Sequence, residues 1–317
     1  MMKSFINCFT GSIVHILNDS SIHESDLILL GGGYLLRSGL DEYGLPEITF
    51  PVQRCGEAAL EKLGVSYKNI SLAPAIDFDE VKMLCKRNNG VIAWTNSAHL
   101  NYSSLYSMNL GYLHSIVISD VENGMVKVFD PLVVDIPPYA THGEMSLAQA
   151  TLALSDVVKT DTYNLMGKLL VIHPCKRIEF SCELKQQNMR QLSELFFQND
   201  ECLLSIDKYI ALNQSLYKSA DSAMKKTISR RLFDHVQVLY IIPILNMLLS
   251  KSDSLKIKNH LTEEIRQWQT VAMMALKNSK ILSDRVFDKI IITLENCSQF
   301  RKQYWESIRN ESVSNWC

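Results

Sequence analysis

The chain lacks three features that would each point to a different class of protein. No run approaches the ~18 apolar residues of a membrane-spanning helix, so we expect no membrane association. Basic residues are not in excess, with 32 Lys and Arg against 34 Asp and Glu, so we expect no nucleic-acid partner. Polar residues follow too soon after the opening residues for a secretory signal, which leaves a cytoplasmic location as the expectation.

Cysteines at metal-ligand spacing are also lacking. The eight cysteines are scattered, with no CxxC pair, and neither His142 nor His173 has a Cys, Asp or Glu set at ligand spacing. This pattern excludes a disulfide frame and a zinc site, so we expect reduced thiols and no metal. The cysteines are Cys8, Cys55, Cys85, Cys175, Cys182, Cys202, Cys297 and Cys317.

The composition that is present, 47% apolar and 21% charged over 317 residues, is that of a soluble protein with one large or two ordinary domains. The first half mixes strand-like runs with short helical segments, which predicts an α+β domain. Beyond residue 174 only Pro243 interrupts a series of apolar stripes with helical spacing, which predicts an all-α domain. We expect the boundary near 174–182 and divide the chain into 1–176 and 177–317. The helical stretches are 184–197, 202–216, 224–249, 255–277 and 284–308.

A predicted β-hairpin organises the first domain. Apolar runs over 112–119 and 125–131 flank the step Asn123-Gly124, the strongest local signal for a hairpin turn. Because the strands are antiparallel, His114 near the start of the first strand and Asp130 at the end of the second should be neighbours. A histidine held by an aspartate is an oriented base, which usually serves a nucleophile.

Cys8 is the candidate nucleophile. Apolar positions from residue 10 to 17 keep helical spacing, so Cys8 lies at a helix start, where the helix dipole lowers the pKa of a thiol. Cys8, His114 and Asp130 have the residue types of a Cys-His-Asp triad. The residues alone leave a second interpretation open, in which Cys8 is a buried small side chain and His114 a core histidine.

Seven short motifs succeed one another between residues 5 and 155. They read Cys8, His23-Glu24, Gly31-Gly32-Gly33, Leu63-Gly64-Val65, Leu113-His114, Asp130-Pro131 and Ser146-Leu147-Ala148-Gln149-Ala150. In order and spacing they resemble the N-terminal domain family of butirosin biosynthesis protein H. The chain departs from the family pattern at Asn7, where His is expected, at His23, where Ser is expected, and at Leu113, where Gly is expected.

The resemblance implies a papain-like domain with an antiparallel sheet, followed here by the all-α domain. It implies a cysteine acyltransferase of natural-product (antibiotic) biosynthesis, with Cys8, His114 and Asp130 as its catalytic residues. The donor would be the phosphopantetheine arm of an acyl or peptidyl carrier protein and the acceptor a small amine, with no bound cofactor. Whether the chain forms a homodimer is left open.

Further residues are assigned around this triad. Papain-like peptidases keep a glutamine oxyanion donor ahead of the cysteine, and none stands before Cys8. Asn7 is the candidate replacement, and Glu24 is expected either to support the site or to cap the second helix with Ser21. Four residues are expected to bind substrate: Gly32, Gly33, Tyr102 and Tyr106.

Two other functions remain open on the sequence. A papain-like peptidase or amidase would use the same triad with water as acceptor. A non-catalytic helical interaction protein would carry a degenerate papain-like domain.

Overall fold

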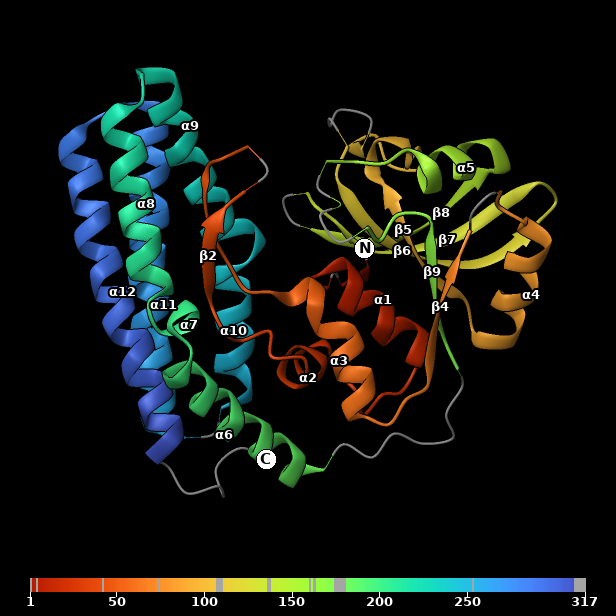
Figure 1. Ribbon diagram of the computed structural model, residues 1–317, viewed down its shortest axis with the longest axis horizontal. Coiled ribbons are helices and arrows are strands. Elements are labelled where there is room, and N and C mark those ends of the chain that lie inside the picture. The colour runs from red at the N-terminus through yellow and green to blue at the C-terminus, as the bar shows by residue number, and fades with distance from the viewer. Residues whose placement is uncertain are drawn as a thin grey trace. The chain divides into compact units, whose positions relative to one another are not determined.

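The computed structural model is α+β, with antiparallel sheets in the N-terminal half and a helical C-terminal region, which confirms the predicted fold class at this level (Figure 1). The structure describes residues 2–3, 5–41, 43–72, 75–106, 111–135, 138–159, 161, 164–173, 181–252 and 254–310.

Backbone contacts divide the chain into two compact units. The α/β unit comprises Met1–Gly31 and Val52–Phe180, and the helical unit comprises Gly32–Pro51 and Ser181–Cys317. The predicted boundary after residue 176 lies outside the described residues. The division differs from the sequence prediction for residues 32–51, which the sequence places with the N-terminal domain and the contacts place with the helical unit.

The α/β unit is built on a seven-stranded sheet in the order β1-β8-β7-β6-β5-β9-β4, with every pairing antiparallel. β6 and β7 form the predicted hairpin, and its turn residues Asn123 and Gly124 both have positive φ, as the favoured two-residue hairpin turn requires. The strands are β1 (Met2–Lys3), β4 (Tyr67–Ser71), β5 (Val91–Asn96), β6 (Leu113–Glu122), β7 (Met125–Val133), β8 (Tyr139–Ser146) and β9 (Lys168–Ile172).

Helices pack on this sheet and bury its central strands. α1 contacts β6 and β7, α4 contacts β6, and α5 contacts β5. All six residues of β5 are buried, which explains why its first four residues, Val91–Trp94, are an unbroken apolar run rather than an alternating one. The helical segments are α1 (Cys8–Leu17), α2 (Glu24–Leu30), η1 (Val52–Arg54), α3 (Cys55–Lys62), α4 (Phe78–Asn88), η2 (Ser97–His99) and α5 (Leu147–Ser155).

β8 is a strand that the sequence does not predict. Most of its side chains are at least partly exposed, and only Ala140 and Met145 are buried, so its apolar alternation is too weak to detect. Pairing with β7 makes it a strand. A separate two-stranded sheet pairs β2 (Arg37–Leu40) with β3 (Pro46–Thr49) in the helical unit.

The helical unit packs long helices around aromatic side chains, as the apolar stripes predict. α11 contacts α9, α10 and α12, while α12 also contacts α6 and α8. Trp268 of α11 and Trp305 of α12 are fully buried in this core. The helices are α6 (Cys182–Gln198), α7 (Asp200–Leu203), α8 (Ser205–Ser219), α9 (Ser222–Phe233), the π-helical η4 (Asp234–Leu239), α10 (Ile241–Lys251), α11 (Leu255–Lys280) and α12 (Asp284–Asn310).

One continuous helical stretch, Ser222–Lys251, is long and apolar enough to cross a membrane by length and composition. The expectation that no segment approaches this limit is therefore wrong on that criterion. About 44% of its most apolar window is buried inside the protein, and the core helix of a soluble protein passes the same test.

The cysteines correct a second expectation. Cys182 is disulfide-bonded, so the prediction of eight reduced thiols is wrong. The expectation of a cytoplasmic location loses the support that it drew from reduced thiols. Among the described cysteines, the free and buried ones are Cys8, Cys55, Cys85, Cys202 and Cys297.

Candidate active site

Cys8 is the first residue of α1, and Asn7 is its N-cap. The Asn7 side-chain oxygen accepts hydrogen bonds from the backbone N–H groups of Phe9 and Thr10, at 2.9 and 3.1 Å. An asparagine with extended backbone at this position satisfies donors that the first helical turn leaves free. The side-chain oxygen of Asn7 therefore caps α1. The expected role of Asn7 as oxyanion donor concerns its amide nitrogen and stays a prediction.

Glu24 fixes the segment that leads to Cys8. Its buried carboxylate accepts hydrogen bonds from the backbone N–H groups of Ile6 and Asn7 and from the Thr10 hydroxyl, at distances of 2.8–3.1 Å. Burial raises the pKa of Glu24, although these three donors oppose the shift. Glu24 therefore stabilises the backbone that leads to Cys8. The helix-capping contact of α2 is made instead by Asp26, whose carboxylate accepts a hydrogen bond from the His23 N–H.

Gly11 lets the first turn of α1 lie close to the chain around the site. A Cβ built on Gly11 would lie 2.7 Å from Cβ and Cγ of Phe5 and 2.8 Å from Cβ of Pro131, the residue after Asp130. The Phe5 N–H also donates to the Pro131 carbonyl at 3.1 Å. The absent side chain thus allows the helix that carries Cys8 to approach the strand that carries Asp130.

Gly11→Ala is expected to destabilise the protein by about 1–2 kcal/mol, because overpacking outweighs the gain in helix propensity. Urea unfolding measures the change. Gly39→Ala is the matched control and should be close to neutral, since a Cβ at Gly39 meets nothing within 4 Å. Equal effects of the two substitutions would contradict the close approach.

His114 and Asp130 are neighbours, as the predicted hairpin requires. The His114 Nε2 lies 2.9 Å from the Asp130 Oδ1, and the residues are 1% and 0% exposed. Val117 pairs with Phe129 in the register of β6 and β7, which brings the start of one strand beside the end of the other. Two residues sixteen positions apart thus form a buried His-Asp pair.

The same imidazole interacts with Cys8. Burial alone would raise the pKa of the Cys8 thiol, but the charge and hydrogen bond of His114, with backbone and hydroxyl contacts from Ser115, hold that pKa below its ordinary value. Burial opposes charge on His114 too, yet Asp130 and Cys8 raise its pKa to about 10. Both shifts favour the charged forms, a thiolate on Cys8 and an imidazolium on His114. Because Nε2 faces Asp130, Nδ1 is the ring nitrogen left for the sulfur.

Ser115 is a residue that the sequence reasoning missed. It follows His114 on β6 and is fully buried beside Cys8. A serine inside a buried strand carries no signal of its own, and only the position directly after the candidate base could have drawn attention to it.

Tyr102 and Tyr106 contact Asp130 through their hydroxyl groups. Both phenols donate to the Oδ2 of Asp130, Tyr102 at 2.9 Å, and the Tyr106 hydroxyl also lies 3.2 Å from the His114 Nε2. Burial and the negative charge of Asp130 raise the pKa of both phenols, so they remain protonated donors. The structure thus adds a contact with Asp130 that the sequence does not predict, and the expected contact with substrate stays a prediction.

Gly32 and Gly33 belong by their contacts to the helical unit, not to the unit that contains the triad. The nearest side-chain atom to a Cβ built on Gly32 is the Leu192 Cδ2, at 3.7 Å. The predicted role of these glycines in substrate binding stays a prediction.

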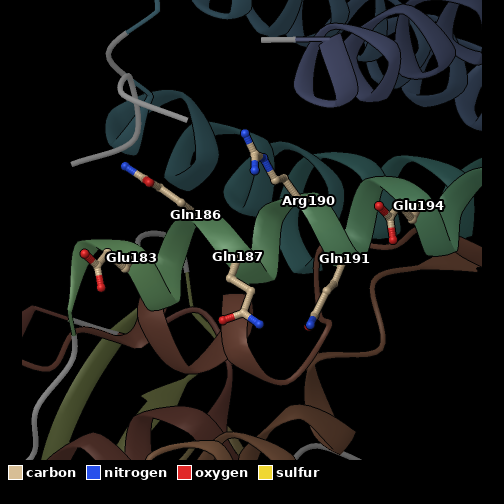
Figure 2. Close-up of a pocket in the computed structure, with 6 residues that line it drawn as sticks. All are labelled: Glu183, Gln186, Gln187, Arg190, Gln191 and Glu194. Atoms are coloured by element: carbon tan, nitrogen blue, oxygen red, sulfur yellow. The ribbon is translucent and has the colours of Figure 1, made fainter. Parts of the chain in front are cut away.

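Two of the described surface hollows lie in the helical unit. One follows α6 and is lined by Glu183, Arg190, Glu194 and three glutamines, whose side chains leave the helix in different directions (Figure 2). A second, at α9 and the end of α11, is lined largely by basic side chains. Within the described residues, no group of three or more His, Cys, Asp or Glu side chains is arranged to hold a metal ion.

No protein-family model matches the chain, and no curated protein matches it either. Any proposal for the function of the chain therefore rests on the geometry of this site. The site brings together a thiol at a helix N-terminus, an imidazole and a carboxylate, the residue types that nucleophilic catalysis at a carbonyl carbon uses.

Proposed function

We propose that the chain is a cysteine acyltransferase with a papain-like catalytic arrangement. It moves an acyl group from the thioester of an acyl or peptidyl carrier protein to a small amine, in natural-product biosynthesis. One observation carries the proposal: Cys8 begins α1 against His114, which Asp130 holds through Nε2. The carrier protein, its phosphopantetheine arm and the amine are what the resemblance adds to this geometry.

In the first half-reaction the Cys8 thiolate attacks the carbonyl carbon of the thioester. A bond forms between the Cys8 Sγ and this carbon, and the bond from the carbon to the carrier sulfur breaks. The leaving thiolate takes the proton from the His114 Nδ1, which leaves a neutral imidazole. The carbonyl oxygen is negative in the tetrahedral state, and the backbone N–H of Cys8, at the start of α1, is suited to stabilise it, since the N–H groups of Phe9 and Thr10 already donate to Asn7.

In the second half-reaction the amine attacks the acyl group on Cys8. His114 removes a proton from the amine nitrogen, the carbon–sulfur bond breaks, and the thiolate–imidazolium pair is restored. Asp130 keeps the ring in one orientation in both steps, because its carboxylate accepts from Nε2.

Burial of the site supports transfer over hydrolysis. Cys8 is 6% exposed, and its two partners are almost fully buried. A water-poor site protects an acyl-enzyme until an amine arrives. A cysteine peptidase or amidase would pass through the same acyl-enzyme and then admit water.

The test is intact-mass measurement after incubation with an acyl-carrier-protein thioester. We expect an increase equal to the acyl group on the wild type and none on Cys8→Ala, because alanine has no nucleophile. Cys55→Ala, which removes a buried thiol elsewhere in the α/β unit, is the control and should acquire the adduct. An adduct on Cys8→Ala, or none on the wild type, would end the proposal.

Product analysis separates transfer from hydrolysis. The preformed acyl-enzyme is mixed with an amine or with buffer alone, and amide and free acid are measured. Free acid at the same rate in both would favour the amidase. A Cys8 that alkylates no faster than a model thiol at neutral pH would favour the non-catalytic interaction protein.

A further inference from the structure

The carboxylate of Asp130 is surrounded by donors. Its Oδ1 accepts from the His114 Nε2 at 2.9 Å and from the Leu132 N–H at 3.0 Å, and its Oδ2 accepts from Tyr102 and Tyr106. Each oxygen thus has two partners, which fills the acceptor sites of an ionised carboxylate. A fully buried carboxylate without such donors would favour its protonated form.

The two phenols come from the segment between η2 and β6, and that segment is anchored where it begins. The Asn96 side chain donates to the carboxylate of Asp156, and the His99 Nε2 lies 2.6 Å from the same carboxylate. Gln149 donates to the His99 carbonyl at 2.8 Å. Tyr102 and Tyr106 also pack edge to face, with ring centroids 5.9 Å apart. The phenols are therefore held against Asp130 by contacts with β5 and α5.

We propose that Tyr102 and Tyr106 form a clamp that keeps Asp130 ionised and so sets the lower pH limit of the thiolate–imidazolium pair at Cys8. The two tyrosines are positioning residues that act through Asp130 on His114. This inference rests on the proposed thiolate chemistry at Cys8 and adds two residues that the triad alone does not include.

A hydrogen bond donated to a carboxylate stabilises the ionised form over the protonated one. If the clamp is removed, Asp130 binds a proton at higher pH. A protonated Asp130 no longer attracts a positive charge on His114, so the thiolate at Cys8 loses its counter-ion. The titratable groups that face Asp130 or its two phenols are His114 on β6, Tyr102 and Tyr106 on their segment, and Tyr112 before β6.

The test is the pH profile of Cys8 alkylation by iodoacetamide in the full chain. In Tyr106→Phe we expect the acid limb of the profile to move to higher pH by about one unit, and in the variant with both Tyr102→Phe and Tyr106→Phe to move further. Tyr67→Phe is the matched control, because the Tyr67 hydroxyl donates to Glu61 at 2.9 Å at the exposed edge of the same sheet. Its profile should superimpose on that of the wild type.

A merely structural role would lower the alkylation rate equally at every pH, and an unshifted acid limb in the double variant overturns the clamp. Tyr102→Phe alone, at the less buried phenol, keeps the test available if the double variant does not fold. Failure of the proposed function is distinguishable, since it appears as a wild-type Cys8 that alkylates no faster than a model thiol. If wild-type Cys8 alkylates faster than a model thiol and the acid limb does not shift in the variants, only the clamp is rejected.

Discussion

His114→Gln is expected to lower the rate of Cys8 alkylation at pH 6 by about a hundredfold. In the wild type, the imidazolium holds the pKa of Cys8 below its ordinary value, so the thiolate forms at lower pH than it would without His114. Glutamine carries no charge, and burial then raises the pKa of the thiol. The loss of thiolate is partly offset because a thiolate of higher pKa is intrinsically more nucleophilic.

The pKa shifts of His114 and Cys8 set the pH range over which Cys8 should be alkylated. Because the pKa of His114 is raised to about 10, the imidazolium persists through the neutral range and is lost only as pH rises through that value. Because the pKa of Cys8 is lowered, thiolate appears as pH rises through that lowered value. The wild type should therefore react over a broad window between these limits, whereas His114→Gln should react only where an unassisted buried thiol ionises.

Peptide mapping assigns the label to Cys8 and separates it from the other free cysteines. His142→Gln, at an exposed histidine on β8, is the matched control and should retain the wild-type profile. If the profile of His114→Gln coincided with that of the wild type, the imidazole would not activate the sulfur, and the proposed mechanism would fail.

Arg301→Met is expected to destabilise the protein by about 3–5 kcal/mol, because it leaves a buried carboxylate without its partner. Arg301 and Glu264 are almost fully buried in the helical unit, where the guanidinium Nε and Nη2 donate to the Glu264 Oε1 at 2.9 and 2.6 Å. Trp268 donates to the same oxygen at 3.2 Å. Urea unfolding followed by circular dichroism measures the loss.

Two comparisons make this prediction specific. The variant with both Glu264→Leu and Arg301→Met should recover most of the stability, since it removes both buried charges together. Arg266→Met removes the partner of Glu263 in an exposed ion pair on α11, the helix that also carries Glu264. This substitution should have no measurable effect on stability. An Arg301→Met variant as stable as Arg266→Met would show that the buried pair is not a strong contact.

The pH dependence of the Arg301→Met loss also has a defined sign. Burial already raises the pKa of Glu264, and Arg301 opposes that shift. Without Arg301 the carboxylate should bind a proton more readily. The loss of stability should therefore shrink as pH falls, because a protonated Glu264 no longer buries a charge.

Features with strong local signals could be predicted from the sequence. The Asn123-Gly124 turn fixes the hairpin, and the hairpin places His114 beside Asp130. The start of α1 at Cys8 follows from the asparagine before it and from the apolar spacing after it. The helices of the C-terminal region follow from stripes of period 3.6, which a helix must bury along one face.

Features that depend on packing between distant segments could not be predicted. The Tyr102 phenol meets a carboxylate 28 residues further along the chain, and nothing in the local pattern distinguishes that contact from a contact with substrate. Glu24 was left between a capping and a supporting role until its three donors were seen around the residues before Cys8. β8 exists because β7 offers it a partner, although its own apolar pattern is weak.

The sequence by itself determined the α+β class, the helical C-terminal region and the order of a thiol, an imidazole and a carboxylate along the chain. These properties follow from periodicity, caps and turns, whose energies depend on residues a few positions apart. The tertiary structure alone decided that residues 32–51 join the helical unit and that two phenols hold Asp130. Such contacts are selected by burial and by the satisfaction of buried polar groups over the whole fold, which no short stretch of sequence encodes.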